Sequence, residues 1–524
     1  MSAVDDPRIR IVRGHGIDPA ALLARLDEPI EISLPTEEMP LRTQLLAITL
    51  TEILARVFPC IRATGDLAQA AAAGLPPGPP SLGERLERAR QRGHRPLLAP
   101  PTSSALVTVC VGHGGVGDLY VDGAGWQSYV GRIPSRLNAA DDTLPVGPLC
   151  AAARAAAHVF RRVLGDLLPE TPGPAASCYW SALDYAASSE PLARPETVTA
   201  TSVRAILAGL GSVGGAAVYL LRHMADLSGQ LYLVDPQLLE QRNYVRALLA
   251  DFDSAAAQLR KTDVAKTALD HHGALKASAH FESFAEYVAA RSPEAALPLV
   301  ACSVDTIPDR RSIQDAMPLE IINAACSTSN VVVSGHRTGE GPCPYCIYIE
   351  QVLDKDNILV RLIERRTGLT AKEVNAALAR GALLPQNVLA RIARYNDLPA
   401  DAFDAYLDRP LIELYRAELV YGESPVADGS AAVAAPFITA LAGFLLAAEV
   451  LKASTPALQP FRLGPQGELR ALGGTRPTKY EEAVFSSPHD ALLMSLPRWE
   501  TPACLCRSER RLELMRARYG LTPS

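Results

Sequence analysis

The sequence predicts an α/β protein with a nucleotide-binding βαβ unit, and three observations predict this class. ILAGLGSVGGAAVYLL (206–221) places Gly-x-Gly-x-x-Gly between a strand-like apolar run and a helix-like one. QLYLVDPQ (230–237) supplies a second strand that ends on Asp235. Two later apolar runs, ALPLVACSVD (296–305) and IINAAC (321–326), predict further strands. Together they indicate a Rossmann-like domain.

A second stretch, VCVGHGGVGDLYV (109–121), fits the same glycine spacing. Here strand-like residues precede Asp122-Gly123, which is a hairpin signal, and no helix is predicted. A phosphate-binding loop needs a helix whose free N–H groups face the ligand. We therefore interpret Gly112, Gly114 and Gly117 as turn glycines.

Composition limits the class of protein. The 524 residues predict roughly two to four domains, and 48% hydrophobic with 21% charged residues is a globular balance. A net charge of −6 argues against nucleic acid as the main partner. The first residues show no secretory signal, so a cytoplasmic protein is expected. The uncharged stretch 429–448 is Ala-rich, contains Pro436 and runs into Glu449 and Lys452, which favours a buried helix over a membrane span.

The pattern along the chain predicts four segments. They are an N-terminal α/β domain (1–195), the first part of the nucleotide-binding domain (196–350), a helical insertion (351–430), and the completion of that domain with the tail (431–524). The first segment closes with a helix at 147–164, and 461–474 is typical of a hairpin. AAHVFRRV (156–163) resembles AAEVLKAS (447–454). This suggests that the first segment is a degenerate copy of the second, and chance similarity between Ala-rich helices explains it equally well.

The residues after Asp235 narrow the chemistry. A carboxylate at this position accepts hydrogen bonds from ribose hydroxyls in NAD and ATP alike. Polar and cationic residues then follow in order: Asn243, Arg246, Lys261 and, after a later strand, Asp305 with Arg310. Cations and Mg²⁺ stabilise the charge that develops on an α-phosphate under attack by a carboxylate. The set therefore favours nucleotidyl transfer, with Asp305 as an oxygen ligand of Mg²⁺.

Four cysteines form two close pairs, Cys343 with Cys346 and Cys504 with Cys506. Two such pairs in a chain without a secretory signal indicate a metal site more than a disulfide framework. Four unrelated thiols are the alternative.

In this order, GLGSVGG, LVDPQLLEQRNYVR, CSVDTIPDRRSIQDA, INAAC, CPYC and CLC resemble the ThiF/MoeB/ubiquitin-activating superfamily, over roughly 200–350 and 430–510. Within it, the domain plan resembles most the activating enzyme of bacterial ubiquitin-like conjugation operons in antiphage defence. The resemblance implies a Rossmann-like adenylation domain after an inactive N-terminal domain. It implies a homodimer that uses ATP and Mg²⁺ to adenylate the C-terminal glycine of a ubiquitin-like protein for transfer to a conjugating enzyme.

The resemblance also implies a role for each matching residue. Gly209, Gly211 and Gly214 would surround the phosphates, Asp235 would bind ribose, Asn243, Arg246 and Lys261 would contact phosphates, and Asp305 would hold Mg²⁺. The family's Gly-Lys/Arg-x-Lys is replaced here by Gln258-Leu259-Arg260-Lys261, so Lys266 is the fallback for Lys261. No segment like Arg-Tyr-Ser-Arg-Gln precedes the first strand, so the arginine that reaches the γ-phosphate in relatives is unassigned.

The same resemblance bears on the cysteines. Cys343, Cys346, Cys504 and Cys506 match the family's structural Zn²⁺ site, although the second pair is the tighter Cys-x-Cys. Segment 351–430 has no cysteine, so a thioester would need another thiol. Cys326 is the leading candidate, ahead of Cys302, Cys60, Cys110, Cys150 and Cys178. Free cysteines are more often packing residues.

Three alternatives stay open at this point. The adenylated group could be a small sulfur carrier or a peptide carboxylate in cofactor or peptide biosynthesis. The protein could be a non-catalytic nucleotide-binding scaffold. Because the glycine motif is shared, a dehydrogenase that binds NAD is the third.

Overall fold

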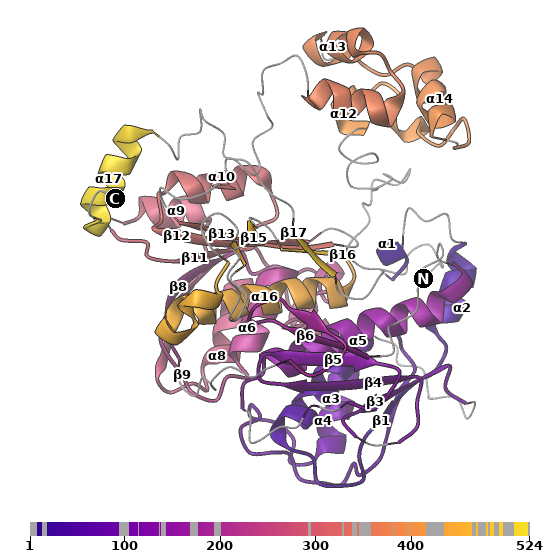
Figure 1. The fold of residues 1–524 in the computed structure, drawn as a ribbon, viewed down its shortest axis with the longest axis vertical. Helices are drawn as coiled ribbons and strands as arrows, with labels where there is room; N and C mark the ends of the chain where they lie inside the picture. Colours follow the sequence, from indigo (N-terminus) through magenta and orange to yellow (C-terminus); the bar gives the residue numbers. More distant parts are fainter. Residues whose placement is uncertain are drawn as a thin grey trace. The chain divides into compact units, whose positions relative to one another are not determined.

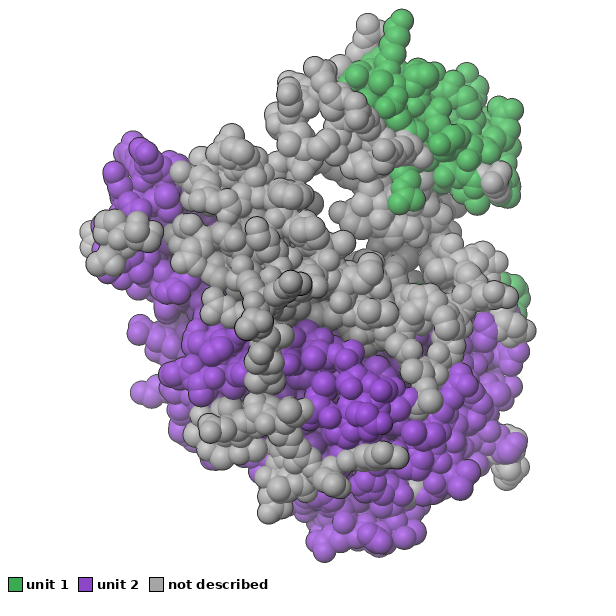
Figure 2. Space-filling view, viewed as in Figure 1, with its two compact units in different colours: residues 1–21, 349–433 green, residues 22–348, 434–524 purple. Residues whose placement is uncertain are grey.

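The computed structural model describes most of the chain. The described residues are 8–12, 18–93, 104–113, 115–135, 137, 143–167, 177–192, 201–291, 295–326, 330–337, 343–344, 358–380, 382–396, 398–414, 434–463, 468–469, 478–479, 483–486, 492–495 and 508–521. The chain divides into two compact units (Figure 2). Unit 1 comprises 1–21 and 349–433, and unit 2 comprises 22–348 and 434–524.

Unit 2 contains two mixed sheets with helices packed on them, so the α/β class is confirmed (Figure 1). The first sheet has the strand order β2-β1-β3-β4-β5-β6-β7. β2, β1, β3 and β4 are mutually parallel, and β5 to β7 are antiparallel. Its elements are β1 (Ile30–Ser33), α3 (Leu41–Leu54), β2 (Ile61–Thr64), α4 (Leu82–Gly93), β3 (Val107–Val111), β4 (Leu119–Ala124), β5 (Gln127–Gly131), α5 (Val146–Leu164), β6 (Ser177–Ser181) and β7 (Ala187–Ser188). Earlier in the sequence come two short helices, α1 (Ile9–Val12), which belongs to unit 1, and α2 (Pro19–Leu26), which begins in unit 1 and ends in unit 2.

The second sheet has the order β10-β9-β8-β11-β12-β13-β16-β17. Its strands β10, β9, β8, β11 and β12 are mutually parallel. Its chain begins in β8 and builds outward on one side before it crosses to β11, which makes a Rossmann-like switch point between β8 and β11. Its elements are β8 (Thr201–Ala208), α6 (Ser212–Leu221), β9 (Leu227–Val234), α7 (Phe252–Ala256), α8 (Lys261–Leu269), β10 (Leu275–His280), α9 (Phe284–Ala289), β11 (Val300–Cys302), α10 (Ile307–Asp315), β12 (Glu320–Cys326), β13 (Asn330–Arg337), α16 (Pro436–Ser454), β16 (Ala483–Ser486), β17 (Leu492–Ser495) and α17 (Glu509–Tyr519). β14 (Glu468–Leu469) and β15 (Thr478–Lys479) form a separate pair.

The two sheets share a topology. In each, the first strand and its helix are followed by a neighbouring strand on one side, and the chain then crosses to the other side. α3 packs on α5 as α6 packs on α16, and α5 and α16 also pack on each other (Figure 1). The similar segments 156–163 and 447–454 lie in these corresponding helices, α5 and α16. The topology therefore gives the sequence similarity a structural counterpart.

The second glycine motif forms turns. Gly112 has φ +70° and Gly115 has φ +82°, while Gly114 lies outside the described residues. β4 and β5 form the expected hairpin, but the sequence placed its turn wrongly. The turn is at Gly125-Trp126, where Gly125 has φ +57°, because Asp122 and Gly123 are already paired within β4.

The hairpin predicted at 461–474 is also only partly right. Its strand β14 pairs with β15, which lies beyond the predicted range.

In unit 1, the described part of 351–430 is helical. It contains α12 (Ile358–Thr367), α13 (Ala371–Arg380), α14 (Gln386–Tyr395) and α15 (Leu411–Leu414). Apolar side chains from these helices, including Ile363, Leu389 and Ile392, form a core of their own. The amphipathic spacing of the sequence thus produces a separate core.

The long apolar helix α16 is buried in unit 2. Pro436 occupies its first turn, where the missing N–H costs nothing. Among the described residues it is the one helix long and apolar enough to cross a membrane, and 89% of that window is buried. A Cβ on Gly443 would lie 2.3 Å from the carbonyl oxygen of Val213, so the glycine permits close packing on α6. Glu449 and Lys452 are buried as an ion pair.

Candidate functional site

The glycine turn between β8 and α6 has three different steric roles. Gly209 has φ +89°, and a Cβ there would lie 2.8 Å from Ser303 and Val304 backbone atoms. A Cβ on Gly214 would lie 2.0 Å from the carbonyl oxygen of Gly209, so this glycine brings helix and strand together. Around Gly211 no atom lies within 4 Å of a built Cβ. The turn is thus tightly packed at Gly209 and Gly214 and open at Gly211, as a phosphate-binding loop requires.

Two further features of this turn favour anion binding. The hydroxyl of Ser303, after β11, donates to the Gly209 carbonyl at 2.7 Å. No side chain caps the N-terminus of α6 at Gly211, so the first N–H groups of the helix are not taken by a cap. Sequence reasoning missed Ser303, whose only signal was its place just before Asp305.

Asp235 directly follows β9 and is 4% exposed. Its carboxylate accepts the Leu210 N–H at 2.6 Å and the Gln237 N–H at 2.7 Å. Burial raises the pKa of Asp235 above its ordinary value, Lys261 and the two amides oppose this, and Asp305 adds to it. The carboxylate therefore lies beside the glycine turn, where it can face a ribose.

The two candidate lysines lie in different places on α8. Lys261 is the first residue of the helix, is 8% exposed, and donates to the Gln237 side chain at 2.5 Å. Lys266 is exposed and pairs with Asp270 at 2.7 Å. Lys261 is therefore the lysine beside Asp235, and Lys266 faces solvent.

Asn243 and Arg246 lie on the segment that leaves β9. The Asn243 side-chain oxygen accepts the Glu240 N–H at 3.0 Å, which closes a short 3₁₀ turn, Gln241–Asn243. The Arg246 carbonyl accepts the Thr439 hydroxyl of α16 at 3.1 Å. The Arg246 side chain is partly exposed, and its charge acts on the Cys326 thiol.

Asp305 follows β11 and its side chain is exposed. Its charge acts on both Asp235 and Cys326, so it lies near both of these groups. Arg310 is instead buried, and it donates to the Asn323 side chain and to the Ala324 carbonyl. Asp305 therefore borders the site, whereas Arg310 ties α10 to β12.

The cysteines differ in their surroundings. Cys326 is half-buried at the end of β12, and burial raises the pKa of its thiol to about 12, with Arg246 opposing and Asp305 reinforcing the shift. The thiol is thus protonated at neutral pH. The other thiol candidates, Cys60, Cys110, Cys150, Cys178 and Cys302, are all buried. Of the predicted Zn²⁺ ligands, Cys343 is buried, while Cys346, Cys504 and Cys506 lie outside the described residues.

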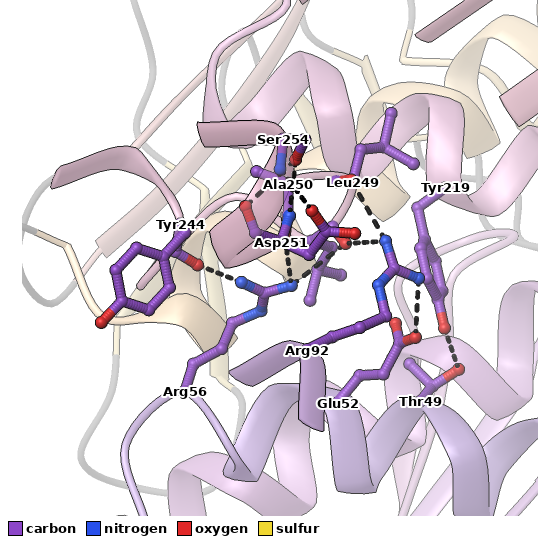
Figure 3. A network of polar contacts seen from close by, with 11 residues as sticks. Thr49, Glu52, Arg56, Arg92, Tyr219, Tyr244, Leu249, Ala250, Asp251 and Ser254 are labelled. Carbon is purple, nitrogen blue, oxygen red and sulfur yellow. Dashed lines mark hydrogen bonds and ion pairs between the residues drawn. The ribbon is translucent and has the colours of Figure 1, made fainter. Parts of the chain in front are cut away.

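The N-terminal half of unit 2, which contains the first sheet (β1 to β7), holds the segment that carries Arg246 (Figure 3). Arg56 is completely buried, and its guanidinium donates to the carbonyls of Tyr244, of Leu248 at 3.1 Å and of Ala250 at 3.0 Å. Burial lowers the pKa of Arg56 to about 10, which still leaves it charged at neutral pH. Its positive charge is stabilised by these carbonyl dipoles of the other half and by the Glu52 and Asp251 carboxylates.

Arg92, in the last turn of α4, makes a second attachment (Figure 3). It donates to the carbonyls of Leu248 at 3.3 Å and Leu249 at 3.1 Å, and it pairs with Glu52 at 3.0 Å. Sequence reasoning missed both arginines. The one signal was Arg56 inside the apolar run ILARVF.

Taken together, the residues that follow β8, β9 and β11 bring Asp235, Asp305 and Lys261 near the open glycine turn, and the Arg246 charge acts on the Cys326 thiol at the end of β12. Backbone N–H groups at a helix start and cations nearby stabilise phosphates. An exposed carboxylate such as Asp305 is a suitable ligand for a hard cation that bridges phosphates. The arrangement suits a nucleoside triphosphate bound with Mg²⁺.

Comparisons with known proteins are distant. No family model matches the chain. An uncharacterized protein, y4jF of Sinorhizobium fredii, is 28% identical over 414 residues, which are 77% of this chain and 75% of that one. A solved structure of E. coli MccB with MccA-N7isoASN aligns at 15% identity with a TM-score of 0.34, over 58% of this chain and 66% of that one, just under two thirds of its length. E. coli MccB with succinimide aligns at 12% identity with a TM-score of 0.35, over 74% and 97%.

Proposed function

We propose that the protein uses ATP and Mg²⁺ to adenylate a carboxylate. The observation that carries the proposal is the gathering of Asp235, Lys261 and Asp305 around the open turn at Gly211, with the Arg246 charge acting at the same edge. Attack of a carboxylate on the α-phosphorus transfers AMP to it and releases pyrophosphate. The charge that builds on the phosphate oxygens is met by Lys261, Arg246 and the N–H groups at the start of α6.

The second carboxylate separates this proposal from dinucleotide binding. A dehydrogenase needs a glycine turn and one acid for ribose, and Asp235 would suffice. Asp305 and the cations have no role in orienting a nicotinamide ring. Asp305 fits Mg²⁺ because its side chain is exposed at the edge of the site. When bound there, Mg²⁺ would neutralise phosphate charge.

The proposed substrate is the C-terminal glycine of a ubiquitin-like protein, handed on to a conjugating enzyme in a bacterial antiphage system. This step rests on the sequence resemblance, as do the homodimer and the Zn²⁺ on Cys343, Cys346, Cys504 and Cys506. Bringing the two reactants together on one surface would supply much of the rate.

A second candidate is adenylation of a peptide or small-carrier carboxylate without a thioester. The protonated Cys326 thiol favours it, because a thioester requires a thiolate nucleophile. In this case the acyl adenylate would be passed directly to an amine or to an external sulfur donor.

Exchange of radiolabelled pyrophosphate into ATP tests the adenylation step. We expect exchange to depend on a partner with a C-terminal glycine, or on a peptide carboxylate for the second candidate, and to fall at least about 100-fold in Asp305→Ala. Asp270→Ala, which removes an exposed carboxylate paired with Lys266, is the matched control. Unchanged function in Asp305→Ala would support a scaffold, and tight NAD binding without ATP binding would support a dehydrogenase.

A further inference from the structure

A second polar cavity lies in unit 2, away from the glycine turn. It has a volume of about 80 Å³ and lies among α3, α4 and the end of α6. α6 starts at the glycine turn and spans ten residues, so its far end is about 15 Å from the candidate nucleotide site. The cavity is therefore separate from that site, and both halves of unit 2 line it.

The lining of this cavity is strongly cationic. Four arginines line it, against one acid, Glu52: three come from α4 and one follows α6, namely Arg85, Arg88, Arg92 and Arg222. Glu52 is already paired with Arg92 at 3.0 Å. Three guanidinium charges thus share one cavity without a carboxylate of their own among the described lining residues.

The positive charges of these guanidinium groups also repel one another. Among the described residues, Arg85 donates to two carbonyls, those of Pro76 at 2.9 Å and Pro79 at 2.8 Å, which are dipoles and not charges. Burial lowers the pKa of Arg222, and repulsion from Arg92 and Arg88 lowers it further, against the pull of Glu52. Like charges that line one small cavity are stabilised by an anion between them.

A buried histidine gives an independent sign of a missing ligand. His223 lines the cavity and is 7% exposed, and neither of its ring nitrogens has a hydrogen-bond partner among the described residues. Nε of Arg222, the residue before it, is likewise buried without a partner. Buried polar groups are nearly always satisfied, by protein, water or a ligand. Here one ligand could satisfy both.

We propose that this cavity binds a phosphate group, as free inorganic phosphate or as the end of a small phosphate monoester. A tetrahedral dianion matches the charge excess, and its several oxygens can accept from forked guanidinium donors and from an imidazole N–H at once. A monocarboxylate has half the charge and fewer acceptor directions. The cavity has room for a group of this size but not for a whole nucleotide.

The site has a structural consequence. Arg88 and Arg92 belong to the N-terminal half, and Arg222 belongs to the second half. A phosphate between them would bridge the halves. Arg92 also holds the carbonyls of Leu248 and Leu249 on the segment that carries Arg246. Phosphate binding is therefore coupled to the position of that segment.

Titration of the full chain tests the proposal, with inorganic phosphate and glycerol 3-phosphate as probes at low chloride concentration. Calorimetry should show one phosphate site, and thermal unfolding should shift upward with phosphate. Arg222→Gln should weaken phosphate binding by at least about tenfold. Arg162 is an exposed arginine of α5 that pairs with Asp118, and the control variant Arg162→Gln should bind phosphate as the parent does. If Arg222→Gln does not fold, Arg88→Gln on the exposed side of α4 takes its place.

The nucleotide site provides the second arm. Arg222→Gln should keep the stabilisation caused by ATP, and Asp235→Asn should lose it while retaining the stabilisation caused by phosphate. Binding of glycerol 3-phosphate as well as phosphate supports a monoester, and binding of phosphate alone supports the free ion. Equal phosphate affinity in Arg222→Gln and the parent, or phosphate binding that is lost in Asp235→Asn, overturns the proposal.

Discussion

The two halves of unit 2 have the same strand order at their centre but different residues after the first strand. After β8, the tight turn at Gly209 leads to Gly211, where the space is open and no side chain caps the start of α6. After β1 the chain reads LPTEEMP, 34–40. Its two prolines have no N–H, and its two glutamates, Glu37 and Glu38, are exposed and would repel phosphate. The two halves thus share a topology, but only the second has a turn after its first strand that suits a phosphate.

What the N-terminal half contributes is different in kind. Its donors are side chains, Arg56 and Arg92, and they point into the other half, where they hold backbone carbonyls. One half therefore offers backbone N–H groups to a ligand, while the other offers guanidinium groups to its neighbour. The division suggests that the first half positions the site and the second half forms it.

Breaking the contact between the halves should have the largest effect on stability. Lys452 of α16 pairs with Glu449 and donates to the carbonyls of Ala182 at 3.3 Å and Leu183 at 2.9 Å. Glu449→Ala would leave this buried ammonium without its carboxylate, and the hydroxyl of Tyr185 would lose its hydrogen-bond acceptor. We expect the free energy of unfolding to fall by about 3–5 kcal/mol. Urea denaturation measures this, and a loss below 1 kcal/mol would mean that the pair contributes little.

Adding a methyl group to each glycine motif should separate the halves next. Gly214→Ala puts a Cβ 2.0 Å from the Gly209 carbonyl oxygen, so we expect loss of ATP binding and of about 2–4 kcal/mol in stability. Gly112→Ala meets its nearest atoms at 3.6 Å, so only its positive φ costs free energy, about 1–2 kcal/mol. ATP binding should survive that change. Calorimetry with ATP decides, and equal losses in both variants would contradict the assignment of one nucleotide-binding half.

The positioning role of the first half predicts a smaller, functional effect. Arg56→Met removes the donors to three buried carbonyls of the segment around Arg246. We expect roughly a tenfold loss in kcat/KM for pyrophosphate exchange, beyond a loss of about 2 kcal/mol in stability. Arg162→Met, at an exposed arginine, serves as control. A stability loss with unchanged kinetics at low temperature would leave Arg56 as a packing residue only.

The smallest effect is expected at Cys326. Since burial raises the pKa of its thiol to about 12, the group is neutral and Cys326→Ala should change pyrophosphate exchange by less than about twofold. Mass spectrometry of the reacted chain provides a second readout. A thioester-linked partner that disappears in Cys326→Ala would show that the bound substrate activates this thiol.

The sequence indicated the centre of the fold more reliably than its edges. The βαβ unit is local: apolar runs, three glycines and Asp235 lie within about thirty residues, so periodicity and turn chemistry suffice. The turn of the β4–β5 hairpin was misplaced because Asp122-Gly123 has turn residues that pair within the strand instead. The β15 strand was missed because it is only two residues long.

The attachment of the halves could not be foreseen from local patterns. Arg56 contacts residues 188, 192 and 194 positions away, and nothing near it in the sequence marks a partner. Sequence spacing alone did not decide whether Lys261 or Lys266 lies at the site. Helix position separates them, because the first residue of α8 lies at the sheet edge while a residue one turn further faces solvent.

The packing of α5 against α16 has a consequence for concentration. Two α/β modules that associate as separate molecules dissociate on dilution. A covalent connection instead keeps the effective concentration of one module near the other constant. The support that Arg56 and Arg92 give is thus present in every copy of the chain, however scarce the protein is in the cell.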